Sequence, residues 1–225
     1  CMLGILLNAQ SSLKSPISTH DVKSDLLVVF FGVHTTGRSI VEALILLAIY
    51  SDYQDKIYDE IENVGYKTHR DNHKVHLLRA VIHESLRLCT NGFFTGVVRT
   101  IEKDGVKLGK HNINKNSIIL PCYPLAMHDP KYWDEAHAFN PHHFLNSNGN
   151  KYKSHIAFNK FGVGKRDCPG IGLAKTMMIS LMVDLIKKYR FISTNMSIDD
   201  LPKWDGSGKF YNALMRTKIR IEMRE

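Results

Sequence analysis

A single cysteine, Cys168, lies in the segment whose residue types point most clearly to chemistry, the run FGVGKRDCPG at residues 161–170. Pro169 suits the first position of a helix, where its missing N–H loses no hydrogen bond, so we expect a helix to begin at Cys168-Pro169. The sulfur would then lie at a helix N-terminus, where free amides and the helix dipole favour a thiolate. Arg166 adds a cation, and three glycines let the backbone approach a flat, bulky group and aim N–H groups at the sulfur. This pattern predicts an anionic sulfur beside a large ligand.

Two other roles for Cys168 stay open from the residues alone. A free cysteine is most often a small buried core residue, but the adjacent Lys165, Arg166 and Asp167 disfavour purely apolar burial. A cysteine nucleophile needs a base to activate it, and no histidine or asparagine can be assigned to that role. The ligand role is therefore the preferred interpretation.

Glu84 and Arg87 form a second pattern. A spacing of three places both side chains on one face of a helix, where they can pair. Taken alone the pair says little, because exposed pairs of this kind contribute only tenths of a kcal/mol. Its weight comes from its position ahead of the cysteine segment.

The run GVHTTG at residues 32–37 interrupts a long apolar stretch with residues that form helices poorly. We expect a local distortion of the helix here, with a functional purpose. The alternative is that Thr35 and Thr36 bond back to the preceding helical turn and have no further role.

Four segments resemble motifs of the cytochromes P-450, and they follow one another along the chain in the order that the family has. Residues 161–170 match every fixed position of the family's haem-binding loop, FxxGxRxCxG, and residues 84–87 match its ExxR motif. Residues 139–144, FNPHHF, resemble FxPxRF, and residues 32–36 resemble the oxygen-activation motif (A/G)Gx(D/E)TT. The resemblance covers essentially the whole chain. It implies the C-terminal half of the fold, from the I helix to the L helix and the terminal strands, and is closest to microsomal members.

The resemblance also implies roles for single residues. Cys168 would ligate the iron within a loop that includes Phe161, Gly162, Gly164 and Gly170, while Arg99 and Arg166 would bind the haem propionates. For Arg99 the alternative is an exposed surface residue. Glu84 and Arg87 would be structural, with His143 standing where arginine is commonest. Thr35 would steady dioxygen and relay protons, and His34 replaces the usual acid.

By resemblance the cofactor is haem b and the electrons come from NADPH through a redox partner. The reaction would insert one oxygen atom from O2 into an apolar organic substrate, in a pocket lined by Phe30, Phe31, Phe93, Phe94 and Phe210. The alternatives are a non-oxygenating isomerase or dehydratase of the same fold, or a haem-binding fragment without turnover. The family's N-terminal half is expected to be absent.

The chain carries a net charge of +8 and contains four widely separated cysteines, which we expect to be reduced. Lysines at positions 151, 153, 160, 165 and 175 flank the cysteine segment and would steer an acidic flavoprotein or ferredoxin-like donor to a basic proximal face. A solvated lysine surface is the alternative. Nucleic-acid binding is not expected, because no aromatic residues interleave with the lysines and no binding motif accompanies them.

Periodicity predicts mainly helices with a few short strands, and the resemblance implies that residues 1–225 are the C-terminal haem-binding part of a single, mainly α domain with small β-sheets. Helices are expected from Asp21 or Ser24 to Tyr50, from Ser51, from Val75 to Leu88 and from Cys168 to Tyr189, the last with an inward stripe of Leu173, Met177, Leu181 and Leu185. Strands are expected at Val97–Thr100, Ser117–Leu120 and Lys218–Met223, with a long loop from Pro121 to Lys165.

The apolar segment from Leu26 to Tyr50 is expected to be too interrupted, by His34, Arg38 and Glu42, to span a membrane. Association through an upstream anchor, at the cytoplasmic face of the endoplasmic reticulum, is implied by the resemblance to microsomal members.

Overall fold

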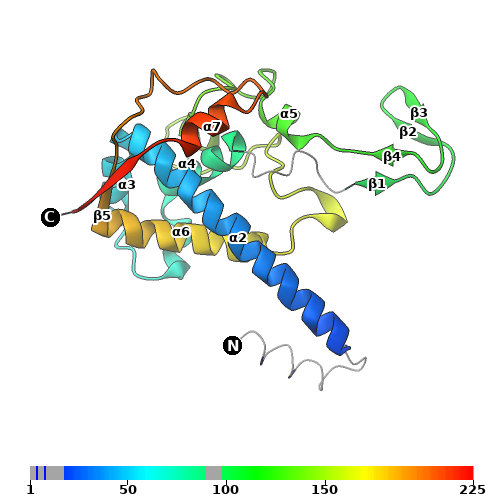
Figure 1. Cartoon of the computed structure of the whole chain (residues 1–225), viewed down its shortest axis with the longest axis horizontal. Helices are drawn as coiled ribbons and strands as arrows, with labels where there is room; N and C mark the ends of the chain where they lie inside the picture. Colours follow the sequence, from blue (N-terminus) through cyan, green and yellow to red (C-terminus); the bar gives the residue numbers. More distant parts are fainter. Residues whose placement is uncertain (1–3, 5–7, 9–17, 90–97, 225) are drawn as a thin grey trace.

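The computed structural model describes residues 4, 8, 18–89 and 98–224. Within these residues the protein is mainly helical with small two-stranded sheets, as predicted. Figure 1 shows the long helix α2 and the helix α6 crossing in the body, with a β-hairpin extending to one side. The order is α2 (Thr19–Ile49), α3 (Asp52–Asn63), η1 (His69–His73), α4 (His76–Leu88), β1 (Arg99–Thr100), β2 (Val106–Leu108), β3 (His111–Ile113), β4 (Ile118–Ile119), α5 (Tyr123–Met127), η2 (Pro141–Phe144), η3 (Gly164–Arg166), α6 (Ile171–Lys188), β5 (Tyr189–Ser193), α7 (Lys209–Met215) and β6 (Ile219–Met223).

Helix α2 begins earlier than predicted, because Ser18 is its N-cap. The Ser18 hydroxyl accepts a hydrogen bond from the Asp21 N–H, and the Asp21 carboxylate accepts one from the Ser18 N–H. This reciprocal capping box satisfies two backbone donors that a helix end leaves free. Asp21 is thus the third residue of the helix and completes the cap of Ser18, while the Ser24 hydroxyl donates to the His20 carbonyl within the helix.

The two parts of α2 have different surroundings. From Thr36 onward most of its side chains are buried, whereas the large apolar side chains from Leu27 to Val33 are exposed. By length and composition α2 is apolar enough to cross a membrane, contrary to the expectation from its polar residues. Length and composition do not distinguish a membrane span from a buried core helix, and from Thr36 onward α2 packs in the core.

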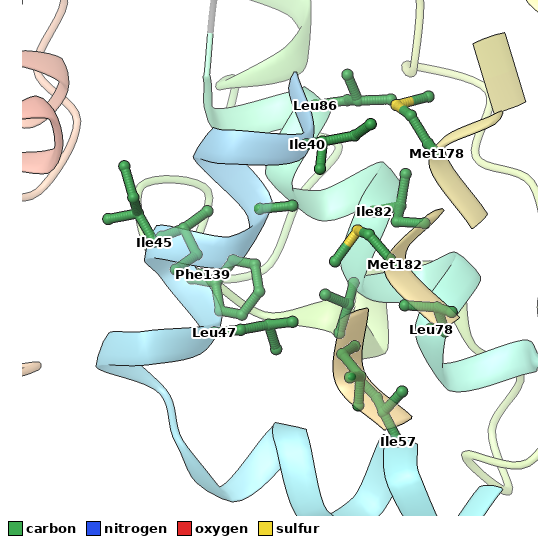
Figure 2. Packing of buried hydrophobic residues seen from close by; sticks show 14 of the residues in the cluster. Ile40, Ile45, Leu47, Ile57, Leu78, Ile82, Leu86, Phe139, Met178 and Met182 are labelled. Atoms are coloured by element: carbon green, nitrogen blue, oxygen red, sulfur yellow. The ribbon is translucent and has the colours of Figure 1, made fainter. Parts of the chain in front are cut away.

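The main core lies where α2, α4 and α6 pack together, with α3 beside them (Figure 2). The predicted inward stripe of α6 is wrong for Leu173 and Leu181, which are 53% and 45% exposed, whereas Leu185 is partly buried against the main core. The helix is apolar on several sides, so periodicity alone did not identify the face that packs against α2 and α4. Its buried residues are Met178, Ile179, Met182, Val183 and Ile186.

Three antiparallel strand pairs complete the described structure. Strands β1 and β4 pair near the predicted positions, and β6 pairs with β5, which was not predicted. The hairpin of β2 and β3 was also missed. It turns at Gly109 and Lys110, where Gly109 takes the left-handed conformation that favours glycine. The expected loop at 121–165 contains the short helical elements α5, η2 and η3.

Gln54 of α3 ties the helical core to the terminal sheet. Its side chain is fully buried and donates from Nε2 to the Leu47 carbonyl (2.8 Å) and to the Phe191 carbonyl (2.7 Å). Its Oε1 accepts from the Phe191 N–H at 2.9 Å. The side chain therefore satisfies buried backbone groups of both α2 and β5.

Gln54→Met retains the side-chain length but leaves these backbone groups without partners. Because each unsatisfied buried group costs about 1–3 kcal/mol, we expect the free energy of unfolding to fall by about 2–3 kcal/mol in urea titrations. The control is Asn63→Leu at the exposed end of the same helix, which should change stability by less than about 0.5 kcal/mol. Equal effects of the two substitutions would contradict the assigned role of Gln54.

Candidate functional site

Helix α6 begins at Ile171, with Gly170 as its N-cap, so Cys168-Pro169 is not the helix start that the sequence predicted. The Cys168 carbonyl accepts a hydrogen bond from the Ile171 N–H at 3.3 Å. Residues 168–171 thus form a turn that precedes the helix, with Pro169 at the second position, which proline favours. Cys168 thus lies three residues before the first helical residue, while its sulfur stays close to the N-cap, 3.8 Å from where a Cβ of Gly170 would be.

The cysteine loop, residues 161–170, is closed by a short backbone hydrogen bond. The Cys168 N–H donates to the Phe161 carbonyl at 2.7 Å, and the Asp167 N–H donates to the Gly164 carbonyl at 3.1 Å. Gly162 and Gly164 have φ of +80° and +77°, where other residues would be strained. These bonds and conformations fix the path of the backbone that carries Cys168.

The Cys168 side chain is partly exposed and forms no disulfide. A Cβ added at Gly170 would lie 3.8 Å from its sulfur, so the glycine keeps that side of the sulfur open. The expected N–H groups aimed at the sulfur are not found, because no hydrogen bond to Sγ is formed within residues 18–89 and 98–224. Instead, the Asp167 and Cys168 N–H groups of this loop, and that of Ile171 at the start of α6, donate to backbone carbonyls.

The two arginines predicted to bind the haem propionates, Arg99 and Arg166, pair with no carboxylate in the described part of the chain. Arg166 is exposed at the end of η3, and Arg99 is half-buried in β1, opposite Ile119. Neither guanidinium forms an ion pair among the described residues. Both therefore remain available to an anionic group.

Arg87 and Glu84 are brought together in the interior, where both side chains are fully buried. Arg87 donates from Nε to Glu84 Oε2 at 2.8 Å and from Nη2 to Glu84 Oε1 at 2.7 Å, a bidentate pair. Its remaining N–H groups donate to backbone carbonyls, so all five donors of the guanidinium are used. These carbonyls belong to Met127 (2.8 Å), Ala136 (2.6 Å) and Ala138 (3.0 Å).

Glu84 accepts from two further groups. The Asn140 N–H donates at 2.9 Å, and His143 Nδ1 lies 3.2 Å from both carboxylate oxygens. Burial alone would raise the pKa of Glu84, but hydrogen bonds from Arg87 and His143 outweigh it and hold the pKa below its ordinary value. His143 Nε2 contacts the Asp134 carbonyl, so both ring nitrogens face oxygen atoms of the protein. The three predicted structural residues thus form one network.

His83, beside Glu84 on α4, was missed by sequence reasoning. Its ring contacts the aromatic side chains of Phe144, Tyr152 and Phe158, and Nδ1 bonds to the Arg79 carbonyl at 2.7 Å. Burial lowers the pKa of His83 to about 3. The available signal was its place within the run AVIHESLRL, which is buried throughout. His83 therefore belongs to the core as a neutral residue.

The Thr35 and Thr36 hydroxyls both donate to the Gly32 carbonyl, at 3.1 and 2.8 Å. Helix α2 continues without interruption through this segment, so the predicted distortion is wrong. Back-bonding within the helix satisfies the hydroxyls without breaking its backbone hydrogen bonds. His34 is exposed, and no described residue bonds to its ring.

Lys160 corrects the predicted lysine surface. Its ammonium turns inward and donates to the Cys89 carbonyl at the end of α4, and burial lowers its pKa to about 8. It lies near the buried Glu42, which accepts a hydrogen bond from Arg38 Nε at 3.1 Å. Lys175 is half-buried over the Phe161 ring. The exposed lysines of the predicted set are Lys151, Lys153 and Lys165.

The described structure does not bring together the phenylalanines that were predicted to line a substrate pocket. Phe30 and Phe31 are 76% and 67% exposed, and Phe210 is buried in the main core. Phe210 reaches the core because α7 packs against α2. Phe93 and Phe94 lie outside the described residues.

Residues 2–213 of this chain match the family model described as Cytochrome P-450. The chain is similar to cytochrome P-450 2B4 of Oryctolagus cuniculus, with 32% identity over 214 residues, which cover 90% of this chain and 43% of that protein. It is also similar to cytochrome P-450 2B19 of Mus musculus, with 31% identity over 195 residues, 84% of this chain and 39% of that protein. The chain spans about two fifths of the length of these relatives.

Arg87→Lys tests the central network. Lysine keeps the charge but cannot donate in five directions, so Glu84 and the backbone carbonyls lose partners inside the core. Breaking a buried pair costs about 3–5 kcal/mol, and we expect a loss of that size in urea unfolding. Arg70→Lys, at an exposed position of η1, is the control and should leave stability unchanged. A similar urea midpoint for Arg87→Lys and the parent chain would show that the network is not needed.

The low pKa of His83 predicts a specific pH dependence. The unfolded histidine binds a proton below about pH 6.5, whereas the folded one does so only near pH 3. Between these values the unfolded state holds more protons, so stability falls as the pH falls, by up to about 1.4 kcal/mol per pH unit for this residue.

His83→Phe should remove this contribution and make the stability curve between pH 6.5 and pH 3 less steep. Chemical unfolding at a series of pH values measures the slope. His69→Phe, at an exposed site, should follow the parent curve. Parallel curves for His83→Phe and the parent chain would refute a buried neutral His83.

Proposed function

Because this chain belongs to the cytochrome P-450 family, we propose that it is the C-terminal, haem-binding part of a haem-thiolate monooxygenase. The proposed reaction inserts one oxygen atom from O2 into an apolar organic substrate, with Cys168 as the proximal iron ligand. The observation that carries the proposal is the cysteine loop, where a partly exposed, unbridged thiol is held on a closed backbone loop.

The residues of this loop fit haem b. Cys168 supplies a soft donor, and Gly170 leaves the sulfur uncovered on one side. Arg166 and Arg99 are cations without an ion-pair partner in the described part of the chain, and they would bind the propionates. When haem is bound, a thiolate of Cys168 on the iron would supply electron density that favours O–O cleavage.

The buried network of Glu84, Arg87 and His143 is connected to the cysteine loop through a series of side-chain contacts. Arg87 and Glu84 fix the backbone between Met127 and Asn140, and His143 joins this network from η2. From η2, contacts pass from the Phe144 ring to the Phe158 ring and on to Phe161 at the start of the cysteine loop. Lys160, the residue before the loop, adds a hydrogen bond to the Cys89 carbonyl at the end of α4. We infer that these contacts position Cys168 and take no part in the chemistry.

Thr35 is the proposed proton-relay hydroxyl. Its Oγ1 donates to Gly32 and keeps its acceptor lone pairs, and its side chain is partly exposed, whereas Thr36 is buried. It can therefore accept a hydrogen bond from water, and rotation of the hydroxyl can pass a proton on. His34, the exposed residue before it, would take the place of the acid that the family usually has there.

Electrons from NADPH would reach the chain through an acidic flavoprotein reductase or a similar donor. The exposed Lys151, Lys153 and Lys165 provide cations for such docking. Lys160 is excluded from this surface because its ammonium is turned inward. By resemblance to microsomal members, we propose a location at the cytoplasmic face of the endoplasmic reticulum membrane.

A second candidate is a haem-binding fragment without turnover. The exposure of Phe30 and Phe31 favours it, since an apolar substrate would not be enclosed on that side of α2. A thiolate spectrum without NADPH-coupled oxygen consumption would select this candidate over the monooxygenase. A non-oxygenating isomerase or dehydratase would instead convert peroxides without NADPH.

The carbon monoxide difference spectrum of the reduced, haem-reconstituted chain tests the proposed ligand. We expect a strongly red-shifted Soret band in the parent chain and in Cys122→Ala, which removes an exposed cysteine. Cys168→Ala should lose this band. A histidine-like Soret position in all three proteins would rule out Cys168 as the ligand under these conditions.

A further inference from the structure

A polar cleft of about 360 Å³ lies where α3 meets the terminal sheet, separate from the cysteine loop. Figure 1 shows α3, β5 and the end of β6 converging near the C-terminal end of the described chain. The volume is within the range of small-ligand sites. Its lining residues are Tyr58, Arg190, Glu222, Met223 and Arg224.

Arg224 is held in this cleft with one edge of its guanidinium unused. Nη1 donates to Asp55 Oδ1 at 3.1 Å, and the Tyr58 ring covers the face of the group at 4.6 Å. Nε and Nη2 are buried and have no hydrogen-bond partner among the described residues. These two atoms form the edge that grips two oxygens of one anion in parallel hydrogen bonds. Buried charged donors without acceptors are costly, so this edge is suited to an anionic ligand.

The charges around the cleft leave it positive. Asp55 is shared, because it pairs with Arg224 through Oδ1 and with Arg190 through Oδ2. Glu222 pairs with Arg220 on the same strand at 2.8 Å. Among the described residues, one carboxylate thus faces two guanidinium groups at the cleft, which leaves one positive charge there without a paired carboxylate.

We propose that this cleft binds a phosphate group. Arg224 would hold two phosphate oxygens through Nε and Nη2, and Arg190 and the Tyr58 hydroxyl would donate to the others. A tetrahedral phosphate accepts bonds from several directions at once, which suits donors from α3, β5 and the end of β6 better than a flat carboxylate does. The phosphate could belong to a soluble compound or to a lipid headgroup.

Calorimetric titration of the full 225-residue chain with inorganic phosphate, in chloride of constant ionic strength, tests the proposal. We expect saturable binding at one site. Arg224→Met should weaken it by about tenfold or more, because it removes charge-assisted hydrogen bonds. Arg224→Lys should weaken it by a similar factor, since lysine lacks the two-donor edge.

The control is Arg70→Met, which removes the same charge from an exposed site on η1 and should bind phosphate as the parent does. Tyr58→Phe retains both arginines and should weaken binding by a few-fold, about 3 to 10 times. Far-UV circular dichroism will show whether the Arg224 variants fold. If they do not, Tyr58→Phe still tests the proposal.

Sedimentation with phosphatidic acid vesicles, against phosphatidylcholine vesicles, separates the two sources of phosphate. Capture that Arg224→Met abolishes would assign a lipid headgroup. Binding of inorganic phosphate without capture would assign a soluble compound. The proposal is overturned if the parent chain shows no saturable phosphate binding, or if Arg224→Met and Tyr58→Phe bind as tightly as the parent.

Discussion

A guanidinium group removed from water keeps a large desolvation penalty unless each of its N–H groups finds an acceptor. Arg87 meets this condition through Glu84 and three backbone carbonyls. The acceptors come from a segment with little regular structure, so the arginine determines where that backbone runs. A helix that carries Glu84 and Arg87 on one face therefore acts as a template for residues 127–140, which have few backbone hydrogen bonds of their own.

The same constraint separates what the sequence could predict from what it could not. The spacing of Glu84 and Arg87 predicted their pairing, and apolar periodicity predicted α4 and most of α2, because these features are local. The face that α6 buries and the inward turn of Lys160 depend on contacts with distant elements, which periodicity does not encode. The start of α6 was misplaced because Pro169 fits a turn before a helix as well as a helix start. Motif order predicted the network residues, while the chemistry assigned to Cys168 and Thr35 stays a prediction.

Two lysines near the cysteine loop, Lys160 and Lys165, have opposite environments. Lys160 is drawn into the interior, where the Cys89 carbonyl and the nearby Glu42 compensate part of its desolvation. Lys165, five residues later, stays in solvent. The first lysine anchors the loop to α4 and the second remains free to meet a partner. Counting lysines along the sequence cannot distinguish these roles, because burial and not composition decides between them.

Helix α2 is packed in the core over only one of its two parts. Its buried part is held by α4 and α6, while the part from Thr19 to Thr35 lies outside the main core cluster. At 1.5 Å per residue this outer part is about 25 Å long, so each degree of tilt displaces its tip by about 0.4 Å. The packing around Ile40 and Leu47 is therefore the pivot about which the outer part of α2 would tilt. A small tilt in the core is therefore amplified most at Thr19, and Phe30 and Phe31, which lie between the core and that end, move with it.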